Sequence, residues 1–301
     1  MNMDKLFDAV NERGNVCVGL DTSLDYIPMK QRVHSRSDSE AMLAFNKMII
    51  DATIDICACY KVQIAYYEEL GMEGLEVYAT TLRYIRERGA LVIADIKRGD
   101  ITDTATRYAK AHFDGEFEAD FVTLSPYMGM DTVDPWLTYV KSKGKGVFVL
   151  MRTSNQGMRD FEYQELANGG RLYDAVGDKL DKLAEKYRGE CGYGAVGAVV
   201  GCTERDEAAE IRARRGSLFF LIPGYGAQGG GAADAALLLK DGNGGIVNAS
   251  RSILKAWTTR DADFLGVEVE ETMNPQAAKA ARQATIDMRD AIKAACAGSP
   301  R

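Results

Sequence analysis

The sequence has little histidine and no long apolar run. Its two histidines, His34 and His112, lie in polar or helical segments, so we do not expect histidine-based catalysis or a histidine metal site. No apolar stretch reaches the roughly 20 residues that a membrane-spanning helix needs. The N-terminal segment carries early acidic residues and lacks the apolar centre of a secretion signal. We therefore expect a soluble, cytoplasmic protein with no membrane partner.

Paired cysteines and long basic runs are also missing. None of the six cysteines belongs to a C-x-x-C pair, and most lie in apolar, strand-like segments. This favours buried free thiols over a zinc site or a disulfide framework. Acidic residues (44 Asp and Glu) outnumber basic ones (37 Lys and Arg). Such a chain is a poor candidate for binding nucleic acid, although a few convergent cations can still bind a small anion.

Short, nearly continuous apolar runs recur along the chain and alternate with helical patterns. Such runs are typical of parallel strands buried on both faces, and the alternation predicts repeated strand–helix units. Eight such units in about 300 residues favour an α/β fold, a (β/α)8 TIM barrel, over the alternative of a doubly wound open sheet. The runs cover residues 15–21, 58–67, 91–97, 120–126, 146–154, 194–201, 217–224 and 245–252.

No linker rich in proline, serine or glycine interrupts the chain, so we predict a single domain over 1–301. Two parts exceed a minimal barrel: a polar excursion at 155–193 and a C-terminal helix at 275–296. Because loops after the strands form the active face of such barrels, the excursion either covers the site or is peripheral to it. Ser37 and Glu40 have capping-box spacing and predict the start of a helix.

The third apolar run is unusual because charged residues end it. Side chains of a strand alternate between its faces, so Asp95 and Lys97 point the same way. Leu91 and Ile93 share that face, which is then the barrel interior. Asp100 follows at the start of the next helix, either as a further charged group or as the helix cap. Buried charges are costly unless they pair, and TIM barrels carry catalysis at the carboxyl ends of their strands. A purely structural ion pair is the alternative.

A second charge, Lys61, interrupts the second apolar run. A lysine in an apolar strand needs a carboxylate partner. Strands two and three are neighbours in a barrel, so we expect Lys61 to meet Asp95 and Asp100. Asp21 ends the first run and adds an acceptor nearby, unless it caps the next element. The polar residues that follow Lys61 either pack or contact the site: Gln63, Tyr66 and Tyr67.

The loops after the seventh and eighth runs form a candidate anion site. Residues 223–231 read PGYGAQGGG, and Arg251 follows the eighth run. Backbone N–H groups in glycine-rich loops bind phosphate, and arginine adds a charge-assisted contact. These two loops are the frequent phosphate site of TIM barrels, whereas a flexible turn is the alternative. Ser125 ends the fourth run and either hydrogen-bonds at the site or forms a Ser-Pro turn.

The D-x-K-x-x-D pattern of Asp95, Lys97 and Asp100 resembles the core motif of the orotidine 5′-phosphate decarboxylase family, in its longer bacterial branch. Lys61 matches the first lysine of that family's Lys–Asp–Lys–Asp tetrad. The match runs in order from about residue 15 to 255, and the segments PGYGAQGG and NASRSI strengthen it. Further matches imply substrate-binding roles: Asp21 on the ribose, Thr104 beside Asp100, Ser125 on the base, and Gln228, Gly229 and Arg251 at the phosphate.

The resemblance implies decarboxylation of orotidine 5′-monophosphate to uridine 5′-monophosphate and carbon dioxide, the last step of de novo pyrimidine nucleotide synthesis. No metal or organic cofactor is implied. Lys97 would stabilise a carbanion at C6 and then protonate it, with Asp95 against the departing carboxylate. In the family, the residues matching Asp100 and Thr104 reach into the partner's site, which implies a homodimer with shared active sites. The shorter branch has bulky residues where this chain has Arg98 and Gly99.

Two other functions compete with this hypothesis. Related sugar-phosphate decarboxylases and hexulose-phosphate synthases share D-x-K-x-x-D but resemble magnesium enzymes with a glutamate on strand two. Lys61 occupies that neighbourhood here, and its ammonium would repel a divalent ion. A non-catalytic nucleotide-binding barrel would keep the phosphate loop but would not need the four charged residues together.

Overall fold

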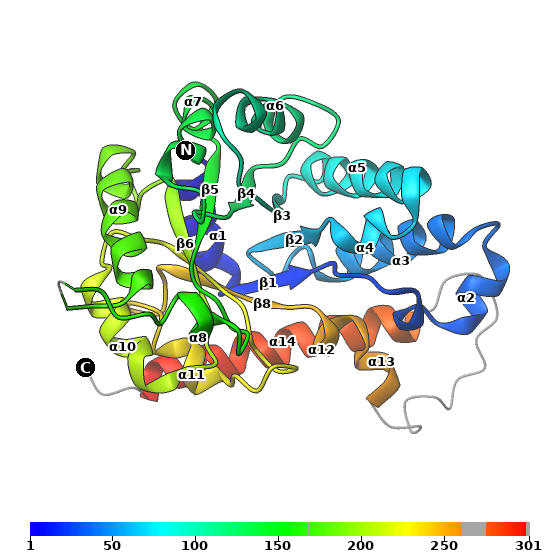
Figure 1. Cartoon of the computed structure of the whole chain (residues 1–301). Helices are drawn as coiled ribbons and strands as arrows, with labels where there is room; N and C mark the ends of the chain where they lie inside the picture. Colours follow the sequence, from blue (N-terminus) through cyan, green and yellow to red (C-terminus); the bar gives the residue numbers. More distant parts are fainter. Residues whose placement is uncertain (168, 260–274, 299–301) are drawn as a thin grey trace.

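The computed structural model describes residues 1–167, 169–259 and 275–298. Eight parallel strands form a closed barrel in chain order, with helices around it (Figure 1). The TIM-barrel prediction is confirmed, because β8 pairs with β1 and leaves no open sheet. The strands are β1 (Val16–Gly19), β2 (Cys59–Gln63), β3 (Leu91–Arg98), β4 (Phe121–Leu124), β5 (Gly146–Arg152), β6 (Val196–Val200), β7 (Phe220–Ile222) and β8 (Gly245–Ala249).

Helices fill the intervals between strands and both ends of the described chain. The α-helices are α1 (Asn2–Arg13), α2 (Met29–His34), α3 (Asp38–Thr53), α4 (Ala65–Glu68), α5 (Gly71–Glu87), α6 (Thr102–Phe113), α7 (Asp134–Lys143), α8 (Met158–Phe161), α9 (Leu172–Lys186), α10 (Arg205–Arg214), α11 (Ala232–Ala236), α12 (Arg251–Leu254), α13 (Ala256–Thr259) and α14 (Pro275–Gly298). Two short 3-10 helices are η1 (Leu24–Tyr26) and η2 (Met130–Thr132). The excursion at 155–193 contains α8 and α9, and α14 covers the helix expected at 275–296.

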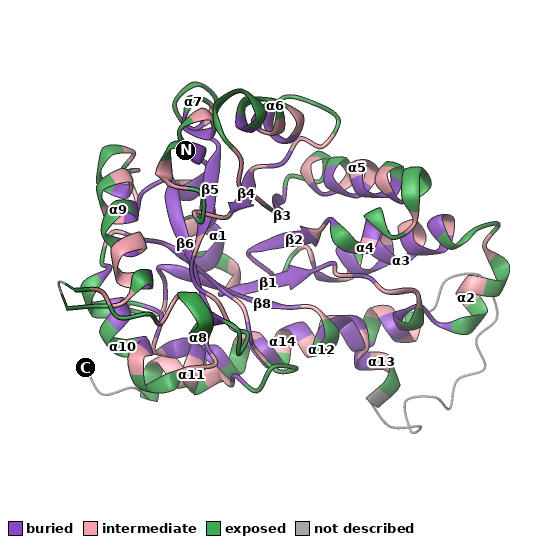
Figure 2. Cartoon of the chain, in the orientation of Figure 1, coloured by how far each residue is buried: buried purple, intermediate pink, exposed green. Residues whose placement is uncertain are grey.

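The barrel interior is apolar except at the carboxyl ends of the strands, where the charged residues lie. Leu91 and Ile93 of β3 pack there with Phe121 and Phe148, whose ring centroids are 5.4 Å apart. The alternate residues of β3, such as Val92, pack outward against the helices, as strand alternation predicts. Figure 2 shows the strands mostly buried and the helices exposed on their outer faces. Charged side chains therefore enter the interior at the carboxyl end of the strands.

Several smaller predictions can also be compared with the structure. The six cysteines are free, as predicted. Ser37 Oγ accepts the N–H of Glu40 at 3.1 Å and caps α3, but the Glu40 carboxylate accepts the N–H of Arg36 rather than that of Ser37. Half of the predicted capping box is therefore present. Within the described ranges, no helix is both long enough and apolar enough to cross a membrane.

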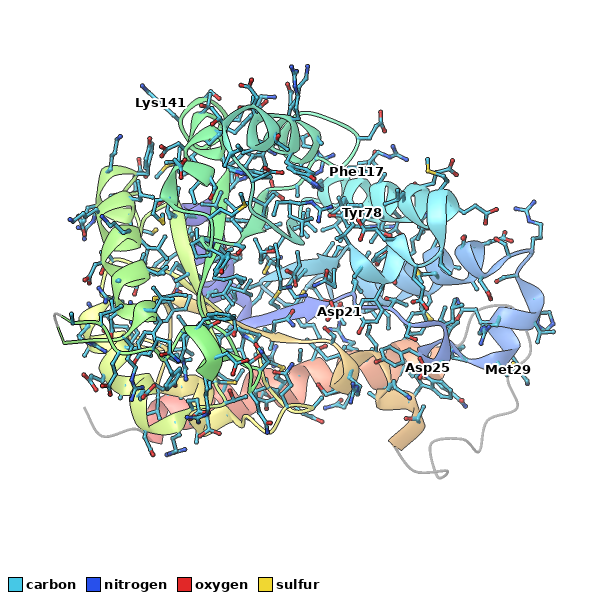
Figure 3. The ribbon with its side chains drawn as sticks, in the orientation of Figure 1. Asp21, Asp25, Met29, Tyr78, Phe117 and Lys141 are labelled. Carbon is cyan, nitrogen blue, oxygen red and sulfur yellow. The ribbon has the colours of Figure 1, made fainter. Side chains whose placement is uncertain are left out.

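His112 on α6 is a buried histidine with a structural role. Its ring packs against Phe117, which in turn packs against Tyr78 (both labelled in Figure 3), and its Nδ1 has no hydrogen-bond partner in the described part of the chain. Burial, assisted by the nearby positive charge of Arg98, lowers the pKa of His112 from 6.5 to about 4. The folded chain therefore holds this imidazole neutral.

This shift predicts that acid destabilises the fold. The unfolded chain takes up the proton near pH 6.5 and the folded chain near pH 4, so stability is complete above pH 6.5 and falls between those values. The loss attributable to His112 is on the order of 3 kcal/mol. Urea unfolding at pH 7 and pH 4 should show a smaller loss for His112→Gln than for wild type. The same change at exposed His34 is the matched control substitution. Equal slopes for wild type and His112→Gln would contradict the assignment.

Candidate active site

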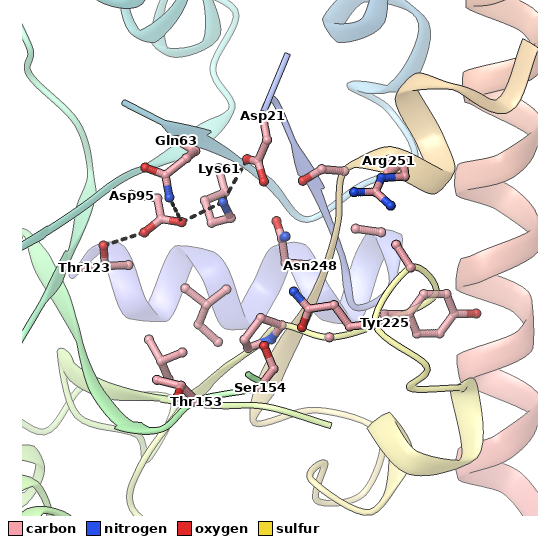
Figure 4. A pocket seen from close by; sticks show the side chains of 18 of the residues that line it. Asp21, Lys61, Gln63, Asp95, Thr123, Thr153, Ser154, Tyr225, Asn248 and Arg251 are labelled. Carbon is pink, nitrogen blue, oxygen red and sulfur yellow. Dashed lines mark hydrogen bonds and ion pairs between the residues drawn. The ribbon is translucent and has the colours of Figure 1, made fainter. Parts of the chain in front are cut away.

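A cavity of about 550 Å³ opens at the carboxyl ends of the strands (Figure 4). Because the barrel keeps chain order, strands β1 to β3 lie across this cavity from β5 to β7. Leu150, Val199 and Leu221 from β5, β6 and β7 give it an apolar wall, and the first three strands bring the charges. An apolar wall that faces charged groups suits a small ligand with both apolar and charged parts. Most of the predicted site residues line it: Asp21, Lys61, Asp95, Lys97, Gln228 and Arg251.

The charged wall is a chain of ion pairs centred on Asp95. Lys97 Nζ lies 2.6 Å from Asp95 Oδ1, and Lys61 Nζ lies 2.8 Å from Asp95 Oδ2. Lys61 Nζ also lies 3.0 Å from Asp21 Oδ1. Two ammonium groups and two carboxylates therefore compensate one another, as the sequence predicts for charges in apolar strands.

These pairs keep the buried members of the cluster ionised. Burial by itself raises the pKa of Asp95, but the charges of Lys61 and Lys97 outweigh burial and hold that pKa below its usual range. Burial likewise lowers the pKa of Lys61, and the carboxylates of Asp21 and Asp95 more than reverse this effect. Asp95 is therefore a fixed anion at neutral pH and does not serve as a proton donor.

The two lysines differ in access to the cavity. The Lys61 side chain is 6% exposed and its ammonium bonds two carboxylates, whereas the Lys97 side chain is 47% exposed and bonds Asp95. A lysine ammonium has three N–H donors, so Lys97 keeps donors for a ligand. Lys97 is thus the cation of this cluster that can contact a reacting atom. Lys61 acts on it only through Asp95, with which both lysines pair.

Lys97 lies where β3 leaves the regular sheet. Between β3 and β4, Ala94 pairs with Val122 and the next pair is Arg98 with Leu124. Three residues of β3 therefore face one residue of β4. Within this bulge Lys97 has a φ of 45°, in the left-handed region that costs a non-glycine residue about 1–2 kcal/mol. The direction of the Lys97 side chain therefore depends on the bulge as well as on strand alternation.

The loop after β7 and the start of α12 form the other end of the cavity. Gln228 and Arg251 line it, as predicted for a phosphate site. The loop folds back on itself: the N–H of Gly226 donates to Gly230 O at 2.8 Å, and the N–H of Gly230 donates to Gly224 O at 3.0 Å. Gly224 and Gly226 have φ values of 101° and 73°, which glycine adopts without steric cost. This end is polar and carries positive charge, so it suits an anion.

Asp100 and Thr104 do not line this cavity. The Asp100 carboxylate accepts the N–H of Ile101 at 2.8 Å, and the ion pairs of Lys61 go to two other carboxylates. The expected contact between Lys61 and Asp100 is therefore wrong within the chain. After the bulge the backbone leaves the barrel and enters α6, where Thr104 is exposed in the first turn.

Ser125 and Gly229 also lie outside the residues that line the cavity. Ser125 follows β4, and its N–H donates to Arg98 O at 2.8 Å. A Cβ on Gly99 would come within 2.7 Å of the Ser125 carbonyl oxygen. The backbone at position 99 lies so close to the residue after β4 that only glycine fits there. Gly229 lies in the glycine turn beside Gln228, with a φ of 96°. At the end of β5, Ser154 lines the cavity instead of Ser125.

Sequence reasoning missed several polar residues that line the cavity, among them Thr123 and Asn248, and left the role of Gln63 open. Thr123 and Gln63 each donate a hydrogen bond to Asp95, at 2.8 Å and 3.0 Å (dashed lines in Figure 4). Asn248 is buried, and its Oδ1 has no partner among the described residues. These residues lie at strand positions whose side chains point into the barrel. The strand alternation that located Asp95 could therefore have assigned them to the cavity. Of the three residues left open, Gln63 and Tyr66 line the cavity and Tyr67 is buried in the core.

Comparison with known proteins agrees with this geometry. The profile of the orotidine 5′-phosphate decarboxylase / HUMPS family matches residues 14–262. The chain is 55% identical over 295 residues to an orotidine 5′-phosphate decarboxylase of Clostridium perfringens strain SM101, covering 98% of this chain and 99% of that protein. Identity to that of Clostridium kluyveri is 52%, over 97% of each chain. A solved OMP decarboxylase of Leishmania donovani has a TM-score of 0.75 at 30% identity, over 98% of this chain and 99% of that one.

Proposed function

The chain belongs to the orotidine 5′-phosphate decarboxylase / HUMPS family and is a carboxy-lyase, and from this premise we propose that its substrate is orotidine 5′-monophosphate. The products are uridine 5′-monophosphate and carbon dioxide. The observation that carries the proposal is the Lys97–Asp95 pair, whose cation faces a cavity with an anion site at its other end. That arrangement supplies a positive charge beside the reacting carbon and a binding site for the remote phosphate.

In the proposed mechanism, the bond between C6 and the carboxylate breaks and its electron pair stays on C6, in the plane of the ring. The Lys97 ammonium stabilises this charge and then gives a proton to C6. A preorganised charge at the point where negative charge develops is among the strongest catalytic devices known. Asp95 lies against the departing carboxylate. Two like charges 4 Å apart repel by about 4 kcal/mol at an effective dielectric constant of 20, and departure of carbon dioxide relieves this repulsion.

The surrounding residues bind and orient the substrate in this proposal. Asp21, already held by Lys61, accepts ribose hydroxyls, and Gln228 with Arg251 binds the phosphate beside the turn that contains Gly229. Ser154 is better placed than Ser125 to hydrogen-bond the base because it lines the cavity.

We further propose that the active unit is a homodimer with shared sites. Asp100 and Thr104 do not line the cavity of their own chain, and Thr104 is exposed, which leaves both free to reach a partner's cavity. The adjacent Ile101 side chain is also exposed, as expected of an interface residue. Light scattering should give twice the chain mass at working concentration; a monomer with full activity would contradict shared sites. A cytoplasmic location stays a prediction from the sequence.

The proposed reaction can be tested directly. Purified protein treated with a chelator is mixed with orotidine 5′-monophosphate, and the loss of substrate absorbance and the release of uridine 5′-monophosphate are followed. We expect turnover at the same rate with and without the chelator, because Lys61 occupies the position from which it would repel a divalent ion. Activity restored by magnesium would indicate the related magnesium enzymes. Binding of uridine 5′-monophosphate without turnover would indicate a non-catalytic barrel.

A further inference from the structure

The bulge in β3 leaves backbone groups that the sheet does not pair. Between the pairs Ala94–Val122 and Arg98–Leu124, Thr123 is the single residue of β4 that faces three residues of β3. Regular pairing is interrupted there, so the N–H groups of the bulge need another acceptor. Lys97 lies in this segment with its φ of 45°.

The Thr123 side chain supplies that acceptor. Its Oγ1 accepts the N–H groups of Ile96 and Lys97, each at 3.0 Å, and donates its own proton to Asp95 Oδ1 at 2.8 Å. The residue is 1% exposed, so water does not compete for these bonds. A hydroxyl has one donor and two acceptor positions, and all three are used here. One buried atom thus bonds the backbone of Lys97 and the carboxylate that pairs with its ammonium.

We propose that Thr123 is a positioning residue for the Lys97–Asp95 pair. This inference rests on the proposed decarboxylation and deepens it. Thr123 fixes the left-handed backbone of Lys97 and the orientation of Asp95 together, so the ammonium is held at the place where the carbanion forms. It contacts neither the leaving carboxylate nor the phosphate site in this role, and acts through the two charged residues.

Loss of the Thr123 hydroxyl should reduce turnover and leave ligand binding nearly unchanged. A displacement of about 1 Å at a reacting group can reduce a rate by roughly 10²-fold. Thr123→Val keeps the shape but removes the hydroxyl, so we expect kcat to fall by about 10²-fold. The phosphate and ribose contacts come from other strands, so the affinity for uridine 5′-monophosphate should stay within about threefold. Thr123→Ser keeps the hydroxyl and should recover most of kcat.

The experiment measures kcat, KM and the affinity for uridine 5′-monophosphate in wild type, Thr123→Val and Thr123→Ser. Thr53→Val is the matched control, because Thr53 is also buried and its hydroxyl also forms hydrogen bonds, with Ile49 O and Tyr60 Oη, away from the cavity. It should lower the melting temperature and leave kcat unchanged. If Thr123→Val does not fold, Thr123→Cys provides a weaker hydrogen-bonding group of similar size and should show the same loss of kcat.

The outcomes distinguish this inference from the proposed function. No turnover by wild type would contradict the function itself. Turnover by wild type together with an unchanged kcat in folded Thr123→Val or Thr123→Cys would overturn the positioning role. An equal loss of kcat in Thr53→Val would also overturn it, because it would show that any lost buried hydroxyl has this effect. A Thr123→Ser variant as slow as Thr123→Val would exclude the hydroxyl as the cause.

Discussion

Replacing Lys97 by alanine should lower kcat by at least about 10⁴-fold. Loss of a preorganised electrostatic contact typically costs 10²–10³-fold and loss of a proton donor about 10²–10⁴-fold, and the proposed mechanism gives Lys97 both roles. No other cation of the cluster can replace it, because Lys61 is 6% exposed and bonds two carboxylates. Turnover is measured by the absorbance of orotidine 5′-monophosphate.

The controls for this prediction separate chemistry from folding. Lys97→Ala should still bind uridine 5′-monophosphate, since the proposed phosphate site, with Gln228 and Arg251, lies at the other end of the cavity. Lys141, an exposed lysine on α7 that is labelled in Figure 3, provides the matched substitution to alanine and should leave kcat unchanged. A Lys97→Ala enzyme that retains more than about a tenth of kcat would contradict the assignment of Lys97 to carbanion stabilisation.

Replacing Arg251 by alanine should lower kcat/KM by about 10²–10³-fold. The guanidinium lines the end of the cavity opposite Asp95, and a hydrogen bond with the Tyr26 side chain raises its already high pKa further, so it stays cationic. Binding energy from a remote phosphate can position the ring and close loops, so kcat should fall as well as KM rise. Arg251→Lys should recover part of the loss, because lysine keeps the charge without the two-pronged contact.

A substrate without the phosphate provides the internal check on Arg251. Orotidine, the nucleoside, should be decarboxylated slowly and at the same rate by wild type and Arg251→Ala. Orotidine has no phosphate, so removing the arginine that is proposed to bind the phosphate takes no contact away from it. Arg83, an exposed arginine on α5, is the control substitution and should have no effect with either substrate. An unchanged kcat/KM for orotidine 5′-monophosphate in Arg251→Ala would contradict the phosphate assignment.

Much of the fold could be predicted from the sequence because its strands are buried on both faces. Continuous apolar runs mark such strands, and the charges that interrupt them stand out as exceptions. Lys61 and Asp95 were found in this way, and their ion pair is present at 2.8 Å. Strand periodicity could also place Leu91 and Ile93 inside the barrel, because it depends on the backbone alone.

The missed features depend on tertiary geometry that periodicity does not contain. A threonine such as Thr123 is common in strands for steric reasons, so its sequence position does not reveal a hydrogen-bonding role. Ser125 and Ser154 both follow strands, and the local twist of each loop decides which one lines the cavity. The expected contact of Asp100 failed because the bulge ends the regular alternation three residues earlier.

The pairing of β8 with β1 also has a consequence for the order of events during synthesis. The carboxylates and lysines come from the first third of the chain, and Arg251 follows the last strand. Ribosomes make these segments in sequence, so the residues of the ion-pair cluster are synthesised long before Arg251. β8 pairs with β1, and α14 packs on α3, so the last part of the chain closes the barrel against the first part. Because the proposed reaction needs both ends of the cavity, we expect a chain that ends before β8 to have no activity.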